Sequence, residues 1–187
     1  MRINYLTSNA VKFAIAERCF EALDGYELVR RSFDVPEIQS TSCEEIAQRT
    51  ALEAAVQLGE PCVAMDAGFF VPALGGFPGP FVKYVNQWLS ERRLLRLLDS
   101  DDDRGAYFFD ALAIGFPDGK AAVFTERATG RLAREGQYTP SKWPANSLFI
   151  PDGYTVPLGS MTEDEQRDSW GDQNTNWAQL TQYLSRS

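Results

Sequence analysis

The sequence predicts an α/β protein in which one long mixed β-sheet is flanked by helices, folded as a single domain over residues 1–187. Strand-length apolar runs alternate with segments of helical periodicity in the first half of the chain, and strands cluster in the second half. With 187 residues, 44% of them hydrophobic, the chain is long enough to bury one sizeable core. No internal repeat or linker divides it.

The first half reads as strands separated by helices. The polar turn Thr7-Ser8-Asn9 is a helix cap, and Ser42 with Glu45 forms a capping box before a longer helix. Gly59 and Pro61 end that longer helix. The expected elements are a strand over Arg2–Thr7, a helix from Ala10 to about Leu23, a strand over Glu27–Arg30, a helix over Cys43–Leu58 and a strand over Cys62–Met65.

The second half begins with apolar residues at helical spacing from Phe81 to Leu98, with a bend expected near Ser90. The acidic run Asp99–Asp103 lacks the glycine and terminal glutamate of a calcium loop, so we interpret it as a solvated loop. The elements expected after it are strands over Ala106–Phe116 and Ala121–Glu126 joined by a hairpin turn, a strand over Ser147–Pro151 and a closing helix over Asn176–Ser185.

The stretch from Met65 to Lys83 organises the chain. An apolar run leads into a single acid, Asp66, and a small-residue turn, Ala67-Gly68, follows before a second apolar run. A buried strand that ends in a lone carboxylate, next to a glycine that lets backbone approach closely, suits metal or phosphate chemistry. On Asp66 alone, a solvated aspartate at an ordinary strand end is the favoured explanation.

The turn at Thr7-Ser8-Asn9 has the strand–turn–helix geometry that points helix N–H groups at an anion. Lys12 lies in the first turn of that helix, where a cation opposes the helix dipole. This placement favours a phosphate contact over a stabilising role. A surface lysine behind a common cap is the alternative.

Composition excludes several classes of function. A net charge of −8 argues against a nucleic-acid polymer or an anionic membrane as partner, because either needs a basic footprint. The absence of histidine rules out a His base, a His triad or a His-ligated zinc site. We expect no signal peptide or membrane span, reduced packing roles for Cys19, Cys43 and Cys62, and a cytoplasmic location.

Four stretches together resemble the inosine triphosphate pyrophosphatase (ITPase) family, which hydrolyses non-standard purine nucleoside triphosphates to monophosphate and pyrophosphate. The most specific is Asp66–Lys83, which is similar to the family's Asp-(Ser/Thr)-Gly strand and its Leu-Gly-Gly-x-Pro-Gly-Pro-Tyr-x-Lys run. The others are Thr7–Lys12, Val35–Gln39, and the pair Thr129–Leu132 and Phe149–Gly153. The resemblance covers most of the chain, through about Tyr154.

The resemblance implies an ITPase-like, anticodon-binding-like α/β/α fold and a site that binds a nucleotide substrate with Mg²⁺. Asp66 and Lys12 would be catalytic, and Asp66 with Glu37 would hold the metal. The residues implied to contact substrate are Thr7, Ser8, Asn9, Lys12, Ala67, Lys83, Trp143, Asn146 and Arg167. Phosphoanhydride hydrolysis needs charge neutralisation and an in-line water, which carboxylates and Mg²⁺ supply without histidine. A homodimer is implied by analogy.

Several positions depart from the family's pattern. Met65 replaces a glutamate and Ala67 replaces a hydroxyl residue. The base-reading Phe-Gly-(Tyr/Trp)-Asp-Pro becomes Trp143–Ser147, and the later Lys-x-x-x-Ser-His-Arg has no clean counterpart, although Arg167 lies nearby. We therefore expect altered base specificity, with Trp143 or Trp170 stacking on the base; core packing is the alternative role for these tryptophans.

These patterns predict a Mg²⁺-dependent nucleoside triphosphate pyrophosphatase acting on a non-standard or modified nucleotide. Two alternatives remain open from the sequence. One is a hydrolase or transferase that acts on a nucleoside mono- or diphosphate in a specialised pathway. The other is a nucleotide-binding protein without catalysis, which the changes at Met65 and Ala67 favour.

Overall fold

The computed structural model describes residues 1–21, 23–33, 35–98, 103–169 and 175–186. Most of the acidic run 99–103 therefore lies outside the described residues, as does Trp170. The described strands form one sheet in the order β2-β1-β3-β5-β6-β7, with β4 paired to β3. They are β1 (Arg2–Leu6), β2 (Glu27–Arg31), β3 (Cys62–Phe70), β4 (Pro78–Gly79), β5 (Gly105–Gly115), β6 (Ala121–Leu132) and β7 (Phe149–Pro151).

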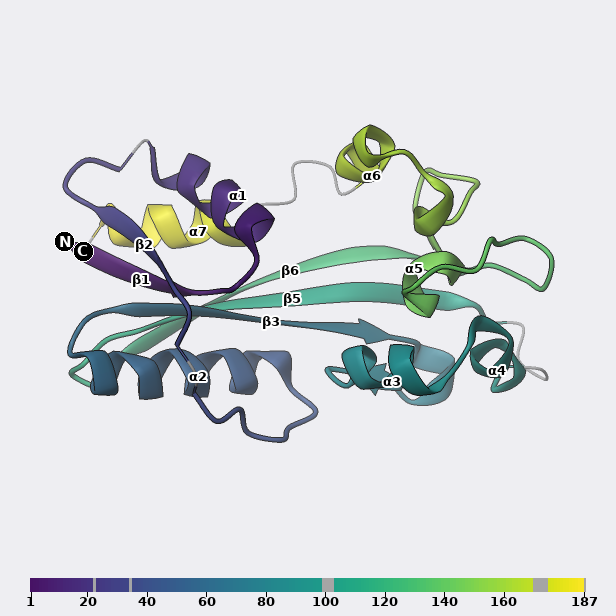
Figure 1. Ribbon diagram of the computed structural model, residues 1–187, viewed down its shortest axis with the longest axis horizontal. Helices are drawn as coiled ribbons and strands as arrows, with labels where there is room; N and C mark the ends of the chain where they lie inside the picture. Colours follow the sequence, from purple (N-terminus) through teal and green to yellow (C-terminus); the bar gives the residue numbers. More distant parts are fainter. Residues whose placement is uncertain (22, 34, 99–102, 170–174, 187) are drawn as a thin grey trace. The chain divides into compact units, whose positions relative to one another are not determined.

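The sheet is mixed, as predicted. Strand β1 pairs in parallel with β2 and β3, whereas β4 pairs antiparallel with β3, and β7 antiparallel with β6. The helices are α1 (Ala10–Phe20), α2 (Cys43–Leu58), α3 (Val82–Trp88), α4 (Glu91–Arg96), α5 (Pro144–Leu148), α6 (Glu163–Ser169) and α7 (Thr175–Leu184), with short 3-10 turns at Pro72–Leu74 and Leu158–Ser160. Figure 1 follows them in chain order.

The chain divides into two compact units. Unit 1 comprises residues 1–66, 110–126 and 173–187, and unit 2 comprises residues 67–109 and 127–172. Strands β3, β5 and β6 contribute residues to both.

In unit 1, helices α1 and α7 lie side by side on one face of the strands, and α2 covers the other face (Figure 1). The α1–α7 face buries Tyr5, whose ring meets Trp177 edge-on at 5.0 Å, together with Leu112 and Ile114 of β5. On the α2 face, a Cβ added to Gly115 would lie only 2.6 Å from the backbone of Ala51. Strand β5 therefore approaches α2 closely enough to require glycine at this point.

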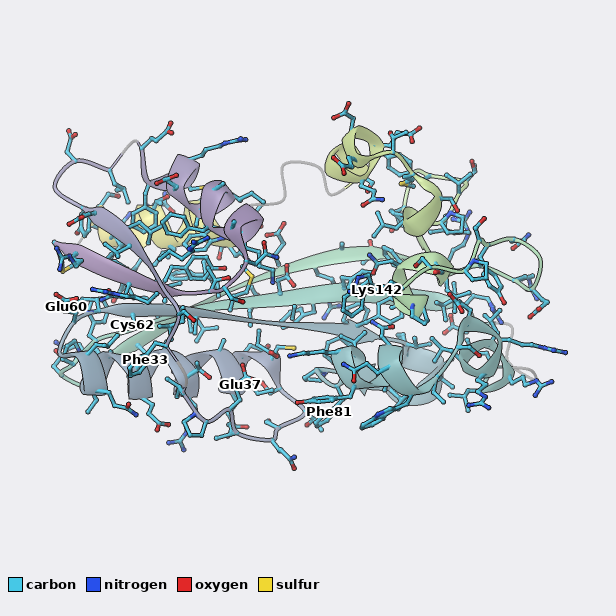
Figure 2. All side chains as sticks on the ribbon, viewed as in Figure 1. Phe33, Glu37, Glu60, Cys62, Phe81 and Lys142 are labelled. Atoms are coloured by element: carbon cyan, nitrogen blue, oxygen red, sulfur yellow. The ribbon has the colours of Figure 1, made fainter. Side chains whose placement is uncertain are left out.

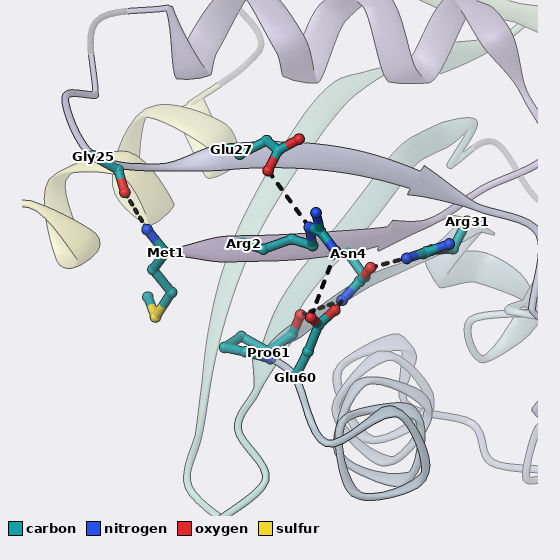
Figure 3. A network of polar contacts seen from close by, with 8 residues as sticks. All are labelled: Met1, Arg2, Asn4, Gly25, Glu27, Arg31, Glu60 and Pro61. Atoms are coloured by element: carbon teal, nitrogen blue, oxygen red, sulfur yellow. Dashed lines mark hydrogen bonds and ion pairs between the residues drawn. The ribbon is translucent and has the colours of Figure 1, made fainter.

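A buried polar network fixes the start of unit 1 (Figure 3). The Asn4 side chain is fully buried; its amide nitrogen donates to Glu60 at 2.9 Å, and its oxygen accepts from Arg31 Nε at 2.9 Å. The Asn4 backbone N–H donates to the Pro61 carbonyl at 2.9 Å. Asn4 thereby joins β1, β2 and the turn before β3, and both polar atoms of its buried side chain have partners.

Unit 2 has an aromatic core of its own. Phe69 of β3 packs on Phe108 of β5 and Phe149 of β7, with ring centroids 4.7 and 5.8 Å apart. Leu94 and Leu95 of α4 and Leu148 of α5 complete this core.

Helix α2 has the predicted ends. The Ser42 hydroxyl accepts from the Glu45 N–H at 3.1 Å, and Gly59 takes the left-handed conformation that ends the helix, with φ of 66°. The helical stretch after Pro80 is divided into α3 and α4 at Leu89 and Ser90, close to the predicted bend.

Two local expectations were wrong. Asp66 does not end a strand, and Ala67-Gly68 is not a turn, because β3 continues as one strand to Phe70. Phe69 and Phe70 pair with Gly79 and Pro78 of β4, which keeps this segment extended. The expected strand start at Ser147 is instead the end of α5, whose proline at the first position favours a helical turn.

Candidate active site

The turn between β1 and α1 is held by its own side chains. Thr7 Oγ1 accepts from the Asn9 N–H at 3.1 Å, and Asn9 Oδ1 accepts from the Lys12 N–H at 3.2 Å. Asn9 therefore caps α1 and satisfies one of the otherwise unbonded N–H groups of its first turn. Ser8 and Asn9 are exposed. The predicted cap is confirmed, and it leaves a polar, electropositive helix start.

Lys12 is exposed at its head and reaches back to the sheet. Its Nζ lies 3.8 Å from the Met65 Sδ of β3. A thioether is only a weak acceptor and carries no charge, so this contact does not neutralise the ammonium. Lys12 has no carboxylate within 4 Å among the residues that the structure describes.

Asp66 lies on the opposite face of β3 from Met65, because successive strand side chains alternate. It is half-buried, and the buried thiol of Cys43, at the first position of α2, forms a hydrogen bond with its side chain. Burial, followed by the charge of Asp66 and this hydrogen bond, raises the pKa of the Cys43 thiol well above its usual range. Cys43 is thus a neutral contact of the predicted catalytic acid.

Two further acids lie on the α1–α7 face. On β5, Asp110 lies two residues before Leu112, so both side chains project from the same face of the strand. On β6, Glu126 lies two residues after Phe124 and shares its face. Leu112 and Phe124 both pack in the core on the α1–α7 face. Burial raises the pKa of Asp110, and the charge of Lys12 partly opposes this. Burial raises the pKa of the Tyr5 hydroxyl well above its usual range. The negative charge of Asp110 raises this pKa further.

Glu126 is tied to the start of α7. Its carboxylate accepts from the backbone N–H groups of Thr175 and Asn176 and interacts with the Thr175 hydroxyl. Its Oε1 is buried and has no hydrogen-bond partner among the described residues. Burial, and secondarily the charge of Asp110, raises the pKa of this carboxyl above its ordinary value.

Glu37, the predicted second metal ligand, is exposed on the loop that leads from β2 to α2 (Figure 2). In the part of the chain that the structure describes, no three Asp, Glu or Cys side chains converge as they would around a metal held by protein alone. Carboxylate oxygens nevertheless match Mg²⁺, which is commonly held by one or two carboxylates together with substrate phosphates and water. Glu37 and Asp66 fit that kind of site.

The remaining predicted residues belong to unit 2. Ala67 follows Asp66 in β3, and Lys83 is exposed on α3. Trp143 is 42% exposed immediately before α5, and the half-buried Asn146 lies within α5. Arg167 belongs to α6, but its side chain is outside the described part of the chain.

Sequence reasoning missed Asp110, Glu126 and the contact between Cys43 and Asp66. Asp110 had a signal, because it is a lone acid inside the otherwise apolar run from Ala106 to Phe116. No sequence signal pointed to Glu126 or Cys43, because only the fold brings Glu126 to α7 and Cys43 to Asp66. No helix in the described ranges has the length and apolar character needed to cross a membrane.

The fold is a mixed α/β sheet with a capped helix start directly after its first strand, and helix starts of this kind present N–H groups that suit an anion. The Ham1 family model matches residues 3–170, and the chain belongs to the Ham1 family. The predicted resemblance to the ITPase family is thereby confirmed.

Curated relatives and solved structures agree with this assignment. The chain is 35% identical over 166 residues to the dITP/XTP pyrophosphatase of Methanopyrus kandleri, covering 89% of this chain and 87% of that relative. The dITP/XTP pyrophosphatase of Thermococcus kodakarensis is 34% identical, with 89% and 88% covered. These relatives belong to the predicted enzyme class.

Among solved structures, a nucleoside-triphosphatase / dITP/XTP pyrophosphatase from Mycobacterium abscessus is 29% identical, with a TM-score of 0.75 and 96% and 97% of the two chains covered. A HAM1 protein from Coxiella burnetii shares the fold over 100% of both chains, with a TM-score of 0.81 at 21% identity. The predicted fold class is confirmed.

Proposed function

We propose that this protein is a nucleoside triphosphate pyrophosphatase that uses Mg²⁺ and releases nucleoside monophosphate and pyrophosphate. One observation carries the proposal: the capped start of α1 directs Lys12 to Met65 of β3, and Asp66 is the next residue of that strand, with its side chain on the other face. A cation and polar N–H groups suit a triphosphate, and a carboxylate suits the water that attacks it. Membership of the Ham1 family supports the same reaction.

Each of these residues has its own role in the proposed reaction. Thr7, Ser8 and Asn9 bind phosphate oxygens at the start of α1, and the Lys12 ammonium balances the charge that develops on the leaving pyrophosphate. Asp66 orients the attacking water and accepts its proton as the bond to the α-phosphorus forms and the α–β bridge breaks. Cys43, through its hydrogen bond, holds the Asp66 side chain in place.

Mg²⁺, when bound with substrate, would neutralise phosphate oxygens, and Glu37 and Asp66 are the carboxylates that would hold it. Lys83 adds positive charge for the phosphates. For the base we propose Trp143, Asn146 and Arg167, with Ala67 near the phosphates. Asn146 offers both a donor and an acceptor where the family has an aspartate, which supports a changed order of base preference.

The decisive experiment is a nucleotide panel with product analysis by phosphorus NMR. We expect Mg²⁺-dependent conversion of at least one triphosphate into equimolar monophosphate and pyrophosphate. Orthophosphate as the first product would instead support a phosphatase, and turnover confined to mono- or diphosphates would support the alternative enzyme. Binding of nucleotide without turnover would leave only a binding protein.

Two further parts of the proposal concern the setting of the enzyme. The cysteines Cys19, Cys43 and Cys62 are free thiols, which is compatible with a reducing, cytoplasmic location. The homodimer is proposed by analogy with the family, and sedimentation at micromolar concentration tests it.

A further inference from the structure

The immediate contacts of Lys12 do not balance the positive charge of its ammonium group. The start of α1 carries the positive end of the helix dipole, which repels an ammonium in the first turn. Its contact with the sheet, Met65 Sδ at 3.8 Å, is uncharged. A lysine under these conditions gains little from leaning toward β3 unless a carboxylate draws it there.

Asp110 is a buried carboxylate on which the charge of Lys12 acts. It lies on β5, beside β3 in the sheet, on the face shared by Met65 and Leu112. Its burial is unfavourable for an ionised acid, and the charge of Lys12 is the compensating interaction. The other groups that face it are Tyr5 of β1 and Glu126 of β6, with Cys43 of α2 farther through the sheet, and none of these is a cation.

We infer that Asp110 is a positioning residue that holds the Lys12 ammonium toward β3, so that the cation is already in place when a triphosphate arrives. The inference rests on the proposed function, because it assigns a role within the same site. A cation held before binding loses less side-chain freedom on binding, and its charge is then oriented for the developing pyrophosphate. The Met65 side chain reaches Lys12 but carries no charge, so in this inference the charge that positions Lys12 comes from Asp110 on the neighbouring strand.

A purely structural role for Asp110 makes the opposite prediction about stability. An aspartate kept for stability should weaken the fold when neutralised. Asp110 is desolvated at a net cost to the folded state, because burial outweighs the attraction of Lys12 in raising its pKa. Neutralising it should therefore leave the fold as stable or make it more stable, while activity falls.

The test compares Asp110→Asn with the double variant Met65→Glu/Asp110→Asn, which returns a carboxylate to the side chain that already reaches Lys12. We expect Asp110→Asn to lower kcat about tenfold, the equivalent of about 1.4 kcal/mol, with KM changed less than about threefold and Tm not lowered. We expect the double variant to recover most of kcat. The control is Asp118→Asn, which neutralises an exposed hairpin acid paired with Lys120 at 2.8 Å and should leave kcat unchanged.

A kcat for Asp110→Asn within about twofold of the unmodified enzyme would overturn the inference. So would a loss of kcat that accompanies a lower Tm, a failure to fold, or no recovery on adding Met65→Glu. Each of these results would make Asp110 a structural residue or an irrelevant one.

A second measurement does not depend on turnover. In the ligand-free protein, NMR relaxation of the Lys12 Cε reports how firmly the side chain is held. We expect mobility to increase in Asp110→Asn and to stay unchanged in Asp118→Asn. If the unmodified protein hydrolyses no nucleotide, the proposed function fails while this result still supports the positioning; unchanged Lys12 mobility rejects the positioning whatever the activity.

Discussion

At the scale of single residues, two faces of β3 have different tasks. Asp66 faces α2 and is held by the thiol of Cys43, whereas Met65 faces α1 and meets Lys12. The strand alternation that separates them also separates the proposed proton acceptor from the proposed phosphate-binding cation.

Changing Asp66 to Asn should abolish turnover while the protein stays folded. The amide keeps the shape of the side chain but cannot accept a proton from water, a loss of about 10² or more in kcat. Steady-state kinetics with circular dichroism tests this, with the exposed Asp24→Asn as the control. Near-native activity of Asp66→Asn with Mg²⁺ would show that the proposed mechanism is wrong.

Changing Lys12 to Ala should weaken triphosphate binding and leave thermal stability equal or slightly higher. The lysine opposes the dipole of α1, an effect of roughly 0.3–1 kcal/mol at an exposed position. Calorimetric titration with a non-hydrolysable triphosphate and thermal melts measure the two effects, and Lys120→Ala is the matched control. Lower stability with unchanged binding would make Lys12 structural.

The raised pKa of Asp110 predicts a pH-dependent stability. The folded state holds its proton to a higher pH than the unfolded chain, where the pKa is about 3.9, so the free energy of unfolding falls as pH rises through that window. In Asp110→Asn this decrease is absent, and the variant should gain stability relative to the unmodified protein from about pH 4 upward. Urea unfolding between pH 4 and 8 measures the difference; a constant difference across that range contradicts the assignment.

At the scale of elements, α2 supports the site because its first residue contacts Asp66. Its start is defined by Ser42, whose hydroxyl accepts from the Glu45 N–H at 3.1 Å. Glu44 and Glu45 in the first turn add favourable charge at the positive end of the helix dipole. The Glu45 carboxylate accepts from the Ser40 hydroxyl at 2.7 Å instead of from the Ser42 N–H, so the expected capping box forms only in its Ser42 half. The Ser42 cap thus fixes where Cys43 lies.

Changing Ser42 to Ala should lower the free energy of unfolding by about 1 kcal/mol, the typical cost of removing an N-cap. Because Cys43 follows directly, we also expect a modest loss of kcat. Ser32→Ala is the control, as Ser32 is exposed and no helix begins there. Equal unfolding free energies for the two variants would mean that the Ser42 hydroxyl does not stabilise α2.

At the scale of the whole molecule, composition limits the partners and the chemistry. A net charge of −8 disfavours nucleic acid, so positive charge for a nucleotide would have to come from a few local groups, and Lys12 and Lys83 are the ones proposed. The absence of histidine removes a donor that the family uses at the base.

We therefore expect ITP and XTP not to be the best substrates. A missing hydrogen-bond partner in a buried pocket costs about 1–3 kcal/mol, whereas stacking by Trp143 tolerates any base. The measurement is kcat/KM across ITP, XTP, dUTP, UTP, CTP, GTP and ATP. A preference for ITP or XTP over every other nucleotide by more than about tenfold, or roughly 1.4 kcal/mol, would reject altered specificity.

The sequence by itself determined the fold class, the Asn9 and Ser42 caps and the motifs that resemble the ITPase family. These features can be predicted from residues that are neighbours in the sequence, because caps, turns and periodicity depend on local backbone geometry. The bend near Ser90 and the glycine end of α2 are predictable for the same reason.

Only the tertiary structure decided that Asp66 lies within a strand, that Cys43 contacts it and that Asp110 is buried where the charge of Lys12 acts on it. The continuation of β3 depends on pairing with β4, which local propensity does not reveal. The environment of Asp110 joins residues about 100 positions apart through the order of the strands. Desolvation and charge act through space. The sequence therefore shows that residue 110 is an acid, but only the fold shows that it is buried and that the charge of Lys12 acts on it.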